Sequence, residues 1–168
     1  MLDDLSFRSA IEFAVATEDT GTRFYSRLAQ KFSDNKQISD VFTQLSRDEM
    51  VHKRQFSNLL ANMPSEPGSV GSPEKTEYLK AMAISEFFSH HQGPFKGIEG
   101  IHDRDEALER AFNFEKATLG FYKAIEDVLG ENPVLKEVME AEKKHIVTLM
   151  KNVVITGAKF RSLQDEWV

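Results

Sequence analysis

The residues of this sequence that are best suited to chemistry form two Glu-x-x-His pairs, Glu49 with His52 and Glu142 with His145. Each pair lies inside a stretch whose apolar residues recur every three or four positions, which is the periodicity of an α-helix. Side chains three residues apart face the same side of a helix, so each pair can direct one carboxylate oxygen and one imidazole nitrogen toward a single point. Converging oxygen and nitrogen donors are typical of a metal site.

Each pair also follows a helical stretch that carries one glutamate on its apolar face, Glu18 before the first pair and Glu115 before the second. One glutamate from each of two helices, with Glu-x-x-His from each of two others, is the ligand set of a carboxylate-bridged two-metal site in a helix bundle. Such a set of four carboxylates and two imidazoles suits iron or manganese and can also hold zinc. We therefore predict six metal ligands: Glu18, Glu49, His52, Glu115, Glu142 and His145.

A different interpretation places these glutamates in buried salt bridges or at the solvated edge of their helices. The nearby basic residues Arg23, Arg27, Lys53 and Lys123 lie off the apolar faces, however, so internal cations are scarce. Because a buried carboxylate without a partner is strongly destabilising, the pattern favours bound metal. Five further acidic residues are expected to be solvated charge: Glu12, Asp48, Glu126, Glu137 and Glu140.

Two tyrosines, Tyr25 and Tyr122, stand two helical turns after Glu18 and Glu115 on the same helical faces. They are too far along the helix to touch those glutamates, but they can hydrogen-bond to a ligand on a neighbouring helix and so support the metal site. The alternative is that both are amphipathic core tyrosines. The sequence leaves the two interpretations open.

Hydrophobic periodicity and capping signals predict an all-α protein with four long helices and one short one. The expected helices span residues 6–32, 36–62, 73–89, 103–129 and 133–156. The stretch 90–102 contains several glycines and is expected to be irregular. A third Glu-x-x-His pair, Glu99 with His102, falls in this stretch, so we interpret it as accidental.

The chain repeats its own pattern. Glu18 is followed by Phe24-Tyr25 as Glu115 is followed by Phe121-Tyr122, and the two Glu-x-x-His stretches align at a constant offset. We therefore expect two similar helix hairpins within one domain, 1–168, joined by a long crossover that contains the short helix. A crossover of this length allows the second and third long helices to run parallel, which is the arrangement of ferritin-like bundles.

The spacing of the predicted ligands from the turns supports their convergence. Glu18 and the first Glu-x-x-His pair each lie about sixteen residues from the turn near Asp34, and an α-helix rises about 1.5 Å per residue. Glu115 and the second pair lie about fifteen and thirteen residues from Gly130, so they also reach similar heights along their hairpin. All six side chains are therefore expected at one level of the bundle.

Charge and composition exclude several other classes of function. The 168 residues carry a net charge of −6 without a basic block, so no nucleic-acid partner is expected. No apolar run is long enough to span a membrane, and the acidic stretch 1–4 does not look like a signal peptide, so we expect a cytoplasmic protein. The absence of cysteine excludes thiolate, disulfide and iron–sulfur chemistry within these residues. Electrons for any redox reaction must therefore come from an external donor.

With these residues placed, the sequence resembles the ferritin-like superfamily and, within it, the rubrerythrin branch. The resemblance covers about residues 6–62 and 103–155 and rests on the Glu…Phe-Tyr and Glu-x-x-His patterns described above. It implies two iron ions per chain, bridged by Glu49 and Glu142. The remaining ligands would each bind a single metal: Glu18, His52, Glu115 and His145.

The resemblance also implies a centre that reacts with peroxide or oxygen. This sequence has Thr118 where typical rubrerythrins have an extra glutamate, and it lacks the cysteines of their electron-donating rubredoxin domain. We therefore expect a di-iron oxidoreductase that reduces peroxide or oxygen, or oxidises ferrous iron. The alternative is a metal-binding or structural bundle without turnover.

The assembly of the chain is predicted from aromatic residues outside the main apolar faces. Phe87, Phe88, Phe95 and Trp167 would leave apolar surface to cover, which favours a homodimer. The family resemblance likewise implies a dimer or a larger assembly.

Overall fold

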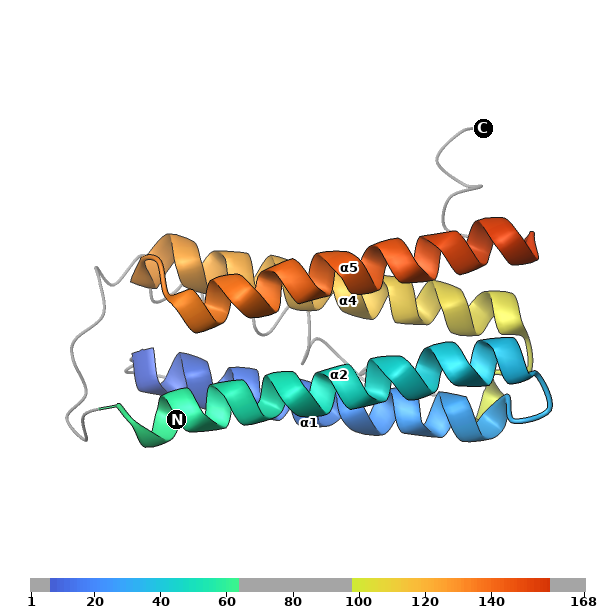
Figure 1. Cartoon of the computed structure of the whole chain (residues 1–168), viewed down its shortest axis with the longest axis horizontal. Coiled ribbons are helices and arrows are strands. Elements are labelled where there is room, and N and C mark those ends of the chain that lie inside the picture. Colours follow the sequence, from blue (N-terminus) through green and yellow to red (C-terminus); the bar gives the residue numbers. More distant parts are fainter. Residues whose placement is uncertain (1–6, 64–97, 158–168) are drawn as a thin grey trace.

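The computed structural model describes residues 7–63 and 98–157, and within these ranges it contains helices and turns but no strand (Figure 1). Its elements are α1 (Phe7–Lys31), α2 (Lys36–Ala61), the short 3₁₀ helix η2 (Ile98–Gly100), α4 (Arg104–Leu129) and α5 (Pro133–Thr156). The predicted all-α four-helix bundle is confirmed, and each long helix begins and ends within one residue of its expected bounds. None of the described helices is long and apolar enough to cross a bilayer.

Side-chain caps explain why the helix boundaries could be predicted. The Asn35 side chain accepts a hydrogen bond from the Ile38 amide at 3.3 Å and so starts α2. Asn132 does the same for α5, where Pro133 occupies the first turn without needing an amide donor. α5 ends at Gly157, whose φ of 65° lies in the left-handed region that favours glycine.

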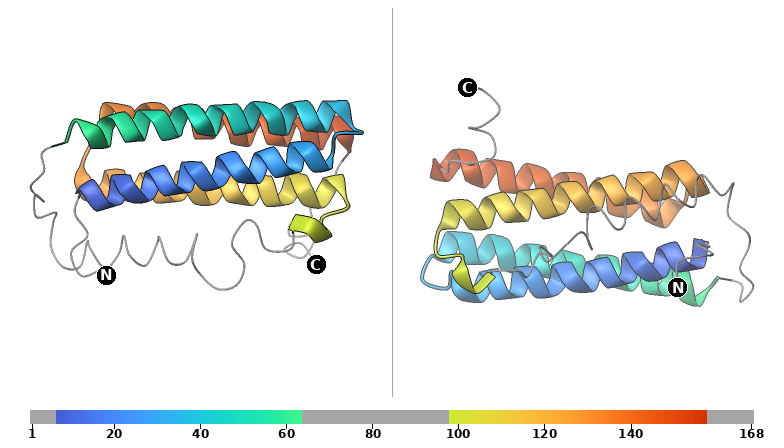
Figure 2. Two further views of the ribbon diagram at one scale, coloured as in Figure 1. Left: turned by 90° about the horizontal axis from the view of Figure 1, so that it is seen from below. Right: turned by 180° about the vertical axis from the view of Figure 1, so that it is seen from behind.

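The four helices form two antiparallel hairpins, α1 with α2 and α4 with α5, packed side by side (Figures 1 and 2). Followed along the chain, α2 and α4 run in the same direction, as the long connection between them predicts. Each of the four helices therefore directs one face toward a common axis. The short 3₁₀ helix η2 lies beside the end of the bundle where α4 begins.

Several predictions fall on residues outside the described ranges. These are the helix at 73–89, most of the crossover, and the aromatic residues Phe87, Phe88, Phe95 and Trp167. The homodimer and the single domain therefore stay predictions.

The buried apolar side chains of the bundle form two clusters. One is built around Tyr25, Phe42 and Leu108, with Ile98 and Ile101 from the region of η2 packed into it. The other includes Phe56, Tyr122, Ile125, Leu135 and Val138. Full burial of a large apolar side chain stabilises a fold by about 1.5–3 kcal/mol. The two clusters can therefore offset the destabilising effect of a polar layer between them.

Candidate metal centre

All six predicted ligands lie in this polar layer between the two clusters, and none of them is more than 5 % exposed. Each of the four helices contributes to the layer at its middle. Glu18 comes from α1 and Glu115 from α4, whereas α2 and α5 each contribute one Glu-x-x-His pair. The expected convergence is therefore present in the structure.

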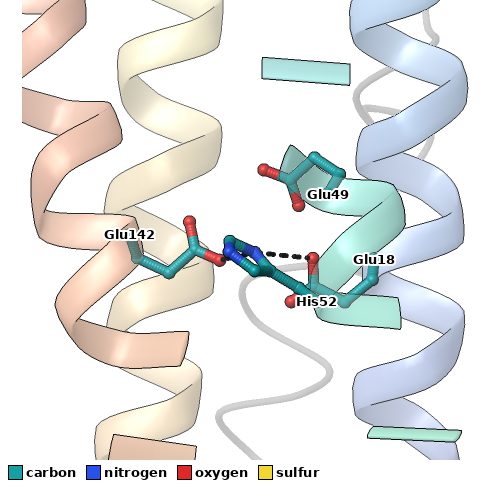
Figure 3. A group of neighbouring side chains, drawn as sticks. All are labelled: Glu18, Glu49, His52 and Glu142. Carbon is teal, nitrogen blue, oxygen red and sulfur yellow. Dashed lines mark ion pairs between the residues drawn. The ribbon is translucent and has the colours of Figure 1, made fainter. Parts of the chain in front are cut away.

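The donor atoms fall into two groups, and within each group all of them lie within 4.8 Å of one another. The first group, drawn in Figure 3, consists of Glu18, Glu49, His52 and Glu142. The second consists of Glu49, Glu115, Glu142 and His145. Because Glu49 and Glu142 belong to both groups, the geometry is that of two adjacent cation positions that share two carboxylates.

Both imidazole rings direct the same nitrogen toward the carboxylates. His52 Nδ1 lies 3.1 Å from Glu142 Oε1 and 3.5 Å from Glu18 Oε2. His145 Nδ1 lies 3.1 Å from Glu142 Oε2 and 3.3 Å from Glu115 Oε2. The centroids of the two rings are 5.3 Å apart. The imidazoles therefore supply one inward-facing nitrogen to each group.

Unpaired donor atoms show that this layer fits metal better than a salt-bridge network. Within the described part of the chain, Glu18 Oε2, Glu49 Oε1, Glu142 Oε1 and His52 Nδ1 are buried without a hydrogen-bond partner. The contacts of His52 Nδ1 with Glu18 and Glu142 have ion-pair distances but not hydrogen-bond geometry. An unpaired buried polar atom is destabilising by about 1–3 kcal/mol. Bound cations would satisfy all four atoms.

The four basic residues that could have formed internal salt bridges lie toward solvent instead. Arg23, Arg27 and Lys123 are exposed, and the half-exposed Lys53 binds Asp19 at 2.7 Å. The interpretation of the buried glutamates as partners of these cations is therefore wrong.

Like charges in the centre shift its proton equilibria. Burial, reinforced by the neighbouring carboxylates, raises the pKa of Glu49 and of Glu142 well above the usual range. Burial alone would lower the pKa of His145, but its hydrogen bonds with Glu115 and Glu142 outweigh burial and raise it. Burial would likewise raise the pKa of Glu115, yet the hydrogen bond from His145 lowers it. Without metal, protons bound to these side chains therefore neutralise part of the negative charge of this layer.

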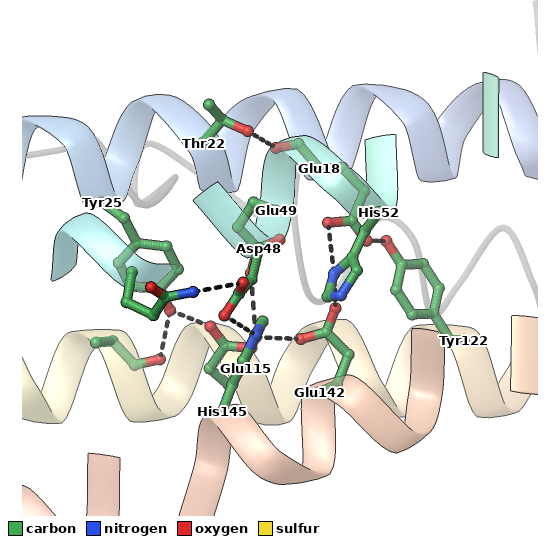
Figure 4. A network of polar contacts seen from close by, with 12 residues as sticks. Glu18, Thr22, Tyr25, Asp48, Glu49, His52, Glu115, Tyr122, Glu142 and His145 are labelled. Atoms are coloured by element: carbon green, nitrogen blue, oxygen red, sulfur yellow. Dashed lines mark hydrogen bonds and ion pairs between the residues drawn. The ribbon is translucent and has the colours of Figure 1, made fainter. Parts of the chain in front are cut away.

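The two tyrosines hydrogen-bond to predicted ligands across the hairpins (Figure 4). The Tyr25 hydroxyl donates to Glu115 Oε1, and the Tyr122 hydroxyl donates to Glu18 Oε1. Burial and the adjacent carboxylates raise the pKa of both hydroxyls well above the usual range, so they remain protonated donors. Their rings also belong to the two apolar clusters. The two interpretations of these tyrosines are thus compatible, and the supporting role at a metal stays a prediction.

Asp48 was expected to be solvated charge; its side chain is half-exposed, but the structure also places it beside a predicted ligand. Its Oδ2 lies 3.5 Å from His145 Nε2, and its Oδ1 accepts a hydrogen bond from Gln44 at 2.8 Å. A carboxylate on the outer nitrogen of a metal-binding imidazole fixes the orientation of the ring. The position of Asp48 in the internal repeat is taken by Ala141 in α5, so His52 receives no matching carboxylate from that position. The four other surface acids are exposed or half-exposed, as expected: Glu12, Glu126, Glu137 and Glu140.

The third Glu-x-x-His pair takes no part in the centre. His102 is exposed and follows η2, and it belongs to neither group of donor atoms. Its interpretation as accidental agrees with this position.

Gly21 is a further residue of the site that the sequence did not reveal. A Cβ built on Gly21 would lie 2.9 Å from Glu49 Oε2 and 3.1 Å from Glu49 Cδ. The shared carboxylate of Glu49 therefore occupies space that only a glycine on α1 leaves free. A glycine inside a helix is the one available sequence signal for such a close approach, but it does not name the neighbour.

We expect Gly21→Ala to lower the metal content of the protein without unfolding it. The added methyl group displaces the Glu49 carboxylate, whereas alanine is favoured over glycine inside a helix by about 0.5–1 kcal/mol. Gly120→Ala is the matched control, because a Cβ at Gly120 meets nothing within 4 Å. Elemental analysis and circular dichroism of both variants check this prediction. Equal metal content in the two variants would contradict it.

Comparison with known proteins gives one match. The rubrerythrin family model matches residues 9–92, half of the chain, and this segment includes Glu18, Glu49 and His52. No curated protein and no solved structure matches the chain. The other three predicted ligands lie beyond the matched segment and are linked to it by the internal repeat and by their position in the bundle.

Proposed function

Because the chain belongs to the rubrerythrin family, we propose that it is a di-iron oxidoreductase that reduces peroxide or oxygen or oxidises ferrous iron. One observation carries the proposal: two groups of buried donor atoms share Glu49 and Glu142. Two metals a few ångströms apart with shared carboxylates are the arrangement of two-metal catalytic sites. The four carboxylates and two imidazoles favour iron or manganese over softer metals.

We assign the ligands from the two donor groups. Glu18 and His52 hold one metal, Glu115 and His145 hold the other, and both groups include the two shared glutamates. Four carboxylates balance the charge of two divalent cations. The raised pKa values of Glu49 and Glu142 mean that metal binding displaces protons from these two residues.

When bound, a pair of iron ions supplies electrons to both oxygens of an O–O bond and polarises that bond. The chain itself positions the ligands, restricts the access of bulk water and supplies hydrogen bonds. Tyr25 and Tyr122 hold the terminal carboxylates of Glu115 and Glu18. The apolar clusters on either side of the layer restrict bulk water. The 168 residues contain no cysteine, so the electrons that return the centre to its reduced state come from a donor outside these residues.

Anaerobic loading with ferrous iron, followed by titration with hydrogen peroxide, tests the proposed function. One peroxide takes one electron from each of two ferrous ions and, with two protons, gives two waters. We therefore expect the ferric absorption in the near ultraviolet to stop rising at one peroxide per two irons. Reduction with dithionite should restore the starting spectrum. Glu140→Ala, which alters an exposed glutamate of α5, is the control and should behave like the unmodified protein.

The same experiment distinguishes a structural metal site from a catalytic one. A protein that takes up zinc but no iron, or iron that peroxide does not oxidise, would contradict the proposed reaction. Metal analysis of the protein isolated from its native host identifies the natural metal.

A further inference from the structure

Thr118 on α4 is a buried polar residue that the proposed ligand set does not use. Its side chain is 1 % exposed, and its Oγ1 has no hydrogen-bond partner within the described part of the chain. Threonines inside helices often donate to the carbonyl four residues earlier. Thr17, Thr20 and Thr22 of α1 do so at 3.1, 2.9 and 2.9 Å. The Thr118 hydroxyl is therefore available for a contact that its own helix does not provide.

The position of Thr118 along α4 directs it toward the metal centre. It lies three residues after Glu115 and four before Tyr122, so all three share one helical face. Thr118 is therefore level with the metal centre along α4. It lies between Glu115, a member of the second donor group, and Tyr122, which hydrogen-bonds to a member of the first.

The internal repeat shows that the two hairpins differ at this position. The residue equivalent to Thr118 in the first hairpin is Gly21, and the Glu49 carboxylate fills the space that a side chain there would need. On α4 the corresponding position carries a Cβ, a methyl group and a hydroxyl. The two faces of the centre therefore differ, and the α4 side is the one that offers a free hydrogen-bonding group.

We propose that the Thr118 hydroxyl is the hydrogen-bonding contact for a small anion, such as peroxide, hydroxide or azide, that binds the metal pair on its α4 side. This inference rests on the proposed function, because the anion needs the two metals. A hydroxyl can donate to an anion and accept from a protonated one, so it suits a ligand that changes its protonation. Binding of the anion would also satisfy a buried hydroxyl that otherwise destabilises the fold.

Azide binding to the di-ferric protein tests this role. Thr118→Val keeps the shape of the side chain and removes the hydroxyl, whereas Thr118→Ser keeps the hydroxyl. We expect Thr118→Val to raise the azide dissociation constant, read from the azide-dependent visible absorption, about tenfold, which corresponds to about 1.4 kcal/mol. The azide stretching frequency should shift in the same variant. Thr118→Ser and the control Thr17→Val should bind azide like the unmodified protein.

The metal-free protein gives a second and independent measurement. A hydroxyl without a partner can be replaced by a methyl group at little loss of stability. Metal-free Thr118→Val should therefore melt at the same temperature as the unmodified protein, or higher. A clear fall in its melting temperature would show that the hydroxyl already has an internal partner, which would overturn the inference.

Metal content, measured for each variant, separates the inference from the proposed function. If Thr118→Val holds two irons and binds azide with unchanged affinity, the role of Thr118 is wrong and the di-iron proposal stands. If Thr118→Val loses metal, the residue supports the ligands instead of an anion, and the inference is overturned. If the unmodified protein does not hold two metals, the proposed function fails and the inference fails with it.

Discussion

Glu49→Ala is expected to reduce the metal content from two ions per chain to one or fewer. Glu49 belongs to both groups of donor atoms, so its removal takes a ligand from each metal position. Glu142→Ala should have the same effect for the same reason. Glu18→Ala, by contrast, removes a ligand from one group only and should leave the other position occupied.

Elemental analysis of protein loaded with ferrous iron and freed of excess metal checks this order of effects. Glu140→Ala is the matched control on α5, because Glu140 is exposed and pairs with Lys143 on the surface. The control should retain two metals. Two tightly bound metals in Glu49→Ala would show that the shared carboxylate is not a ligand.

The second large effect expected is on stability: metal should stabilise the fold, and more so as the pH rises. Metal that binds the native state alone, present at about 1,000 times its dissociation constant, stabilises a protein by about 4 kcal/mol. The ligand side chains of the metal-free protein hold protons instead, and these protons are lost at higher pH. The sign of the pH dependence follows from the direction of each pKa shift.

Four of the six predicted metal ligands have raised pKa values in the folded protein. Burial and neighbouring carboxylates raise those of Glu49 and Glu142. Burial would lower those of His52 and His145, but the neighbouring carboxylates outweigh burial and raise them. A group with a raised pKa stabilises the fold fully below its unfolded pKa, and this contribution is lost as the pH rises toward the folded pKa. The loss begins above 4.5 for the glutamates and above 6.5 for the histidines.

Glu115 acts in the opposite direction, because hydrogen bonds from His145 and Glu142 outweigh burial and lower its pKa. Its stabilising contribution is lost only as the pH falls through that lowered value. Between about pH 5.5 and 8.5 the four raised groups therefore dominate, and the metal-free protein should become less stable as the pH rises.

Thermal unfolding with and without chelator, at several pH values in this range, measures the effect. The difference between the two melting temperatures should grow with pH, because metal binds the carboxylates in their ionised form. Circular dichroism at low temperature verifies that the metal-free sample is folded at each pH. Melting temperatures that chelator leaves unchanged at pH 8 would contradict the metal centre itself.

The sequence predicted the bundle and the six clustered residues because each has a local signal. Asn35 and Asn132 mark helix starts, and the length of the crossover allows α2 and α4 to run parallel, as they do. The glutamates stood out because they occupy positions on apolar helical faces where a leucine or valine is usual. These signals can be read from the sequence of one helix, of one hairpin or of the connection between the hairpins.

The remaining features depend on contacts between different helices, which spacing along the sequence does not reveal. Asp48 lies off the apolar face of α2, and its partner His145 belongs to the other hairpin. The glycine at position 21 was visible, but the carboxylate packed against it was not. The partners of Tyr25 and Tyr122 likewise became identifiable only when both hairpins were placed together.

The two tyrosine hydrogen bonds cross between the hairpins in a reciprocal way. Tyr25 of the first hairpin holds Glu115 of the second, and Tyr122 of the second holds Glu18 of the first. Two identical hairpins related by a two-fold axis would make this same pair of bonds, and each alone would supply half of the donors. The bundle therefore has approximate two-fold symmetry, with one hairpin as each half. Because both halves belong to one chain, equivalent positions can carry different residues, as Gly21 and Thr118 do.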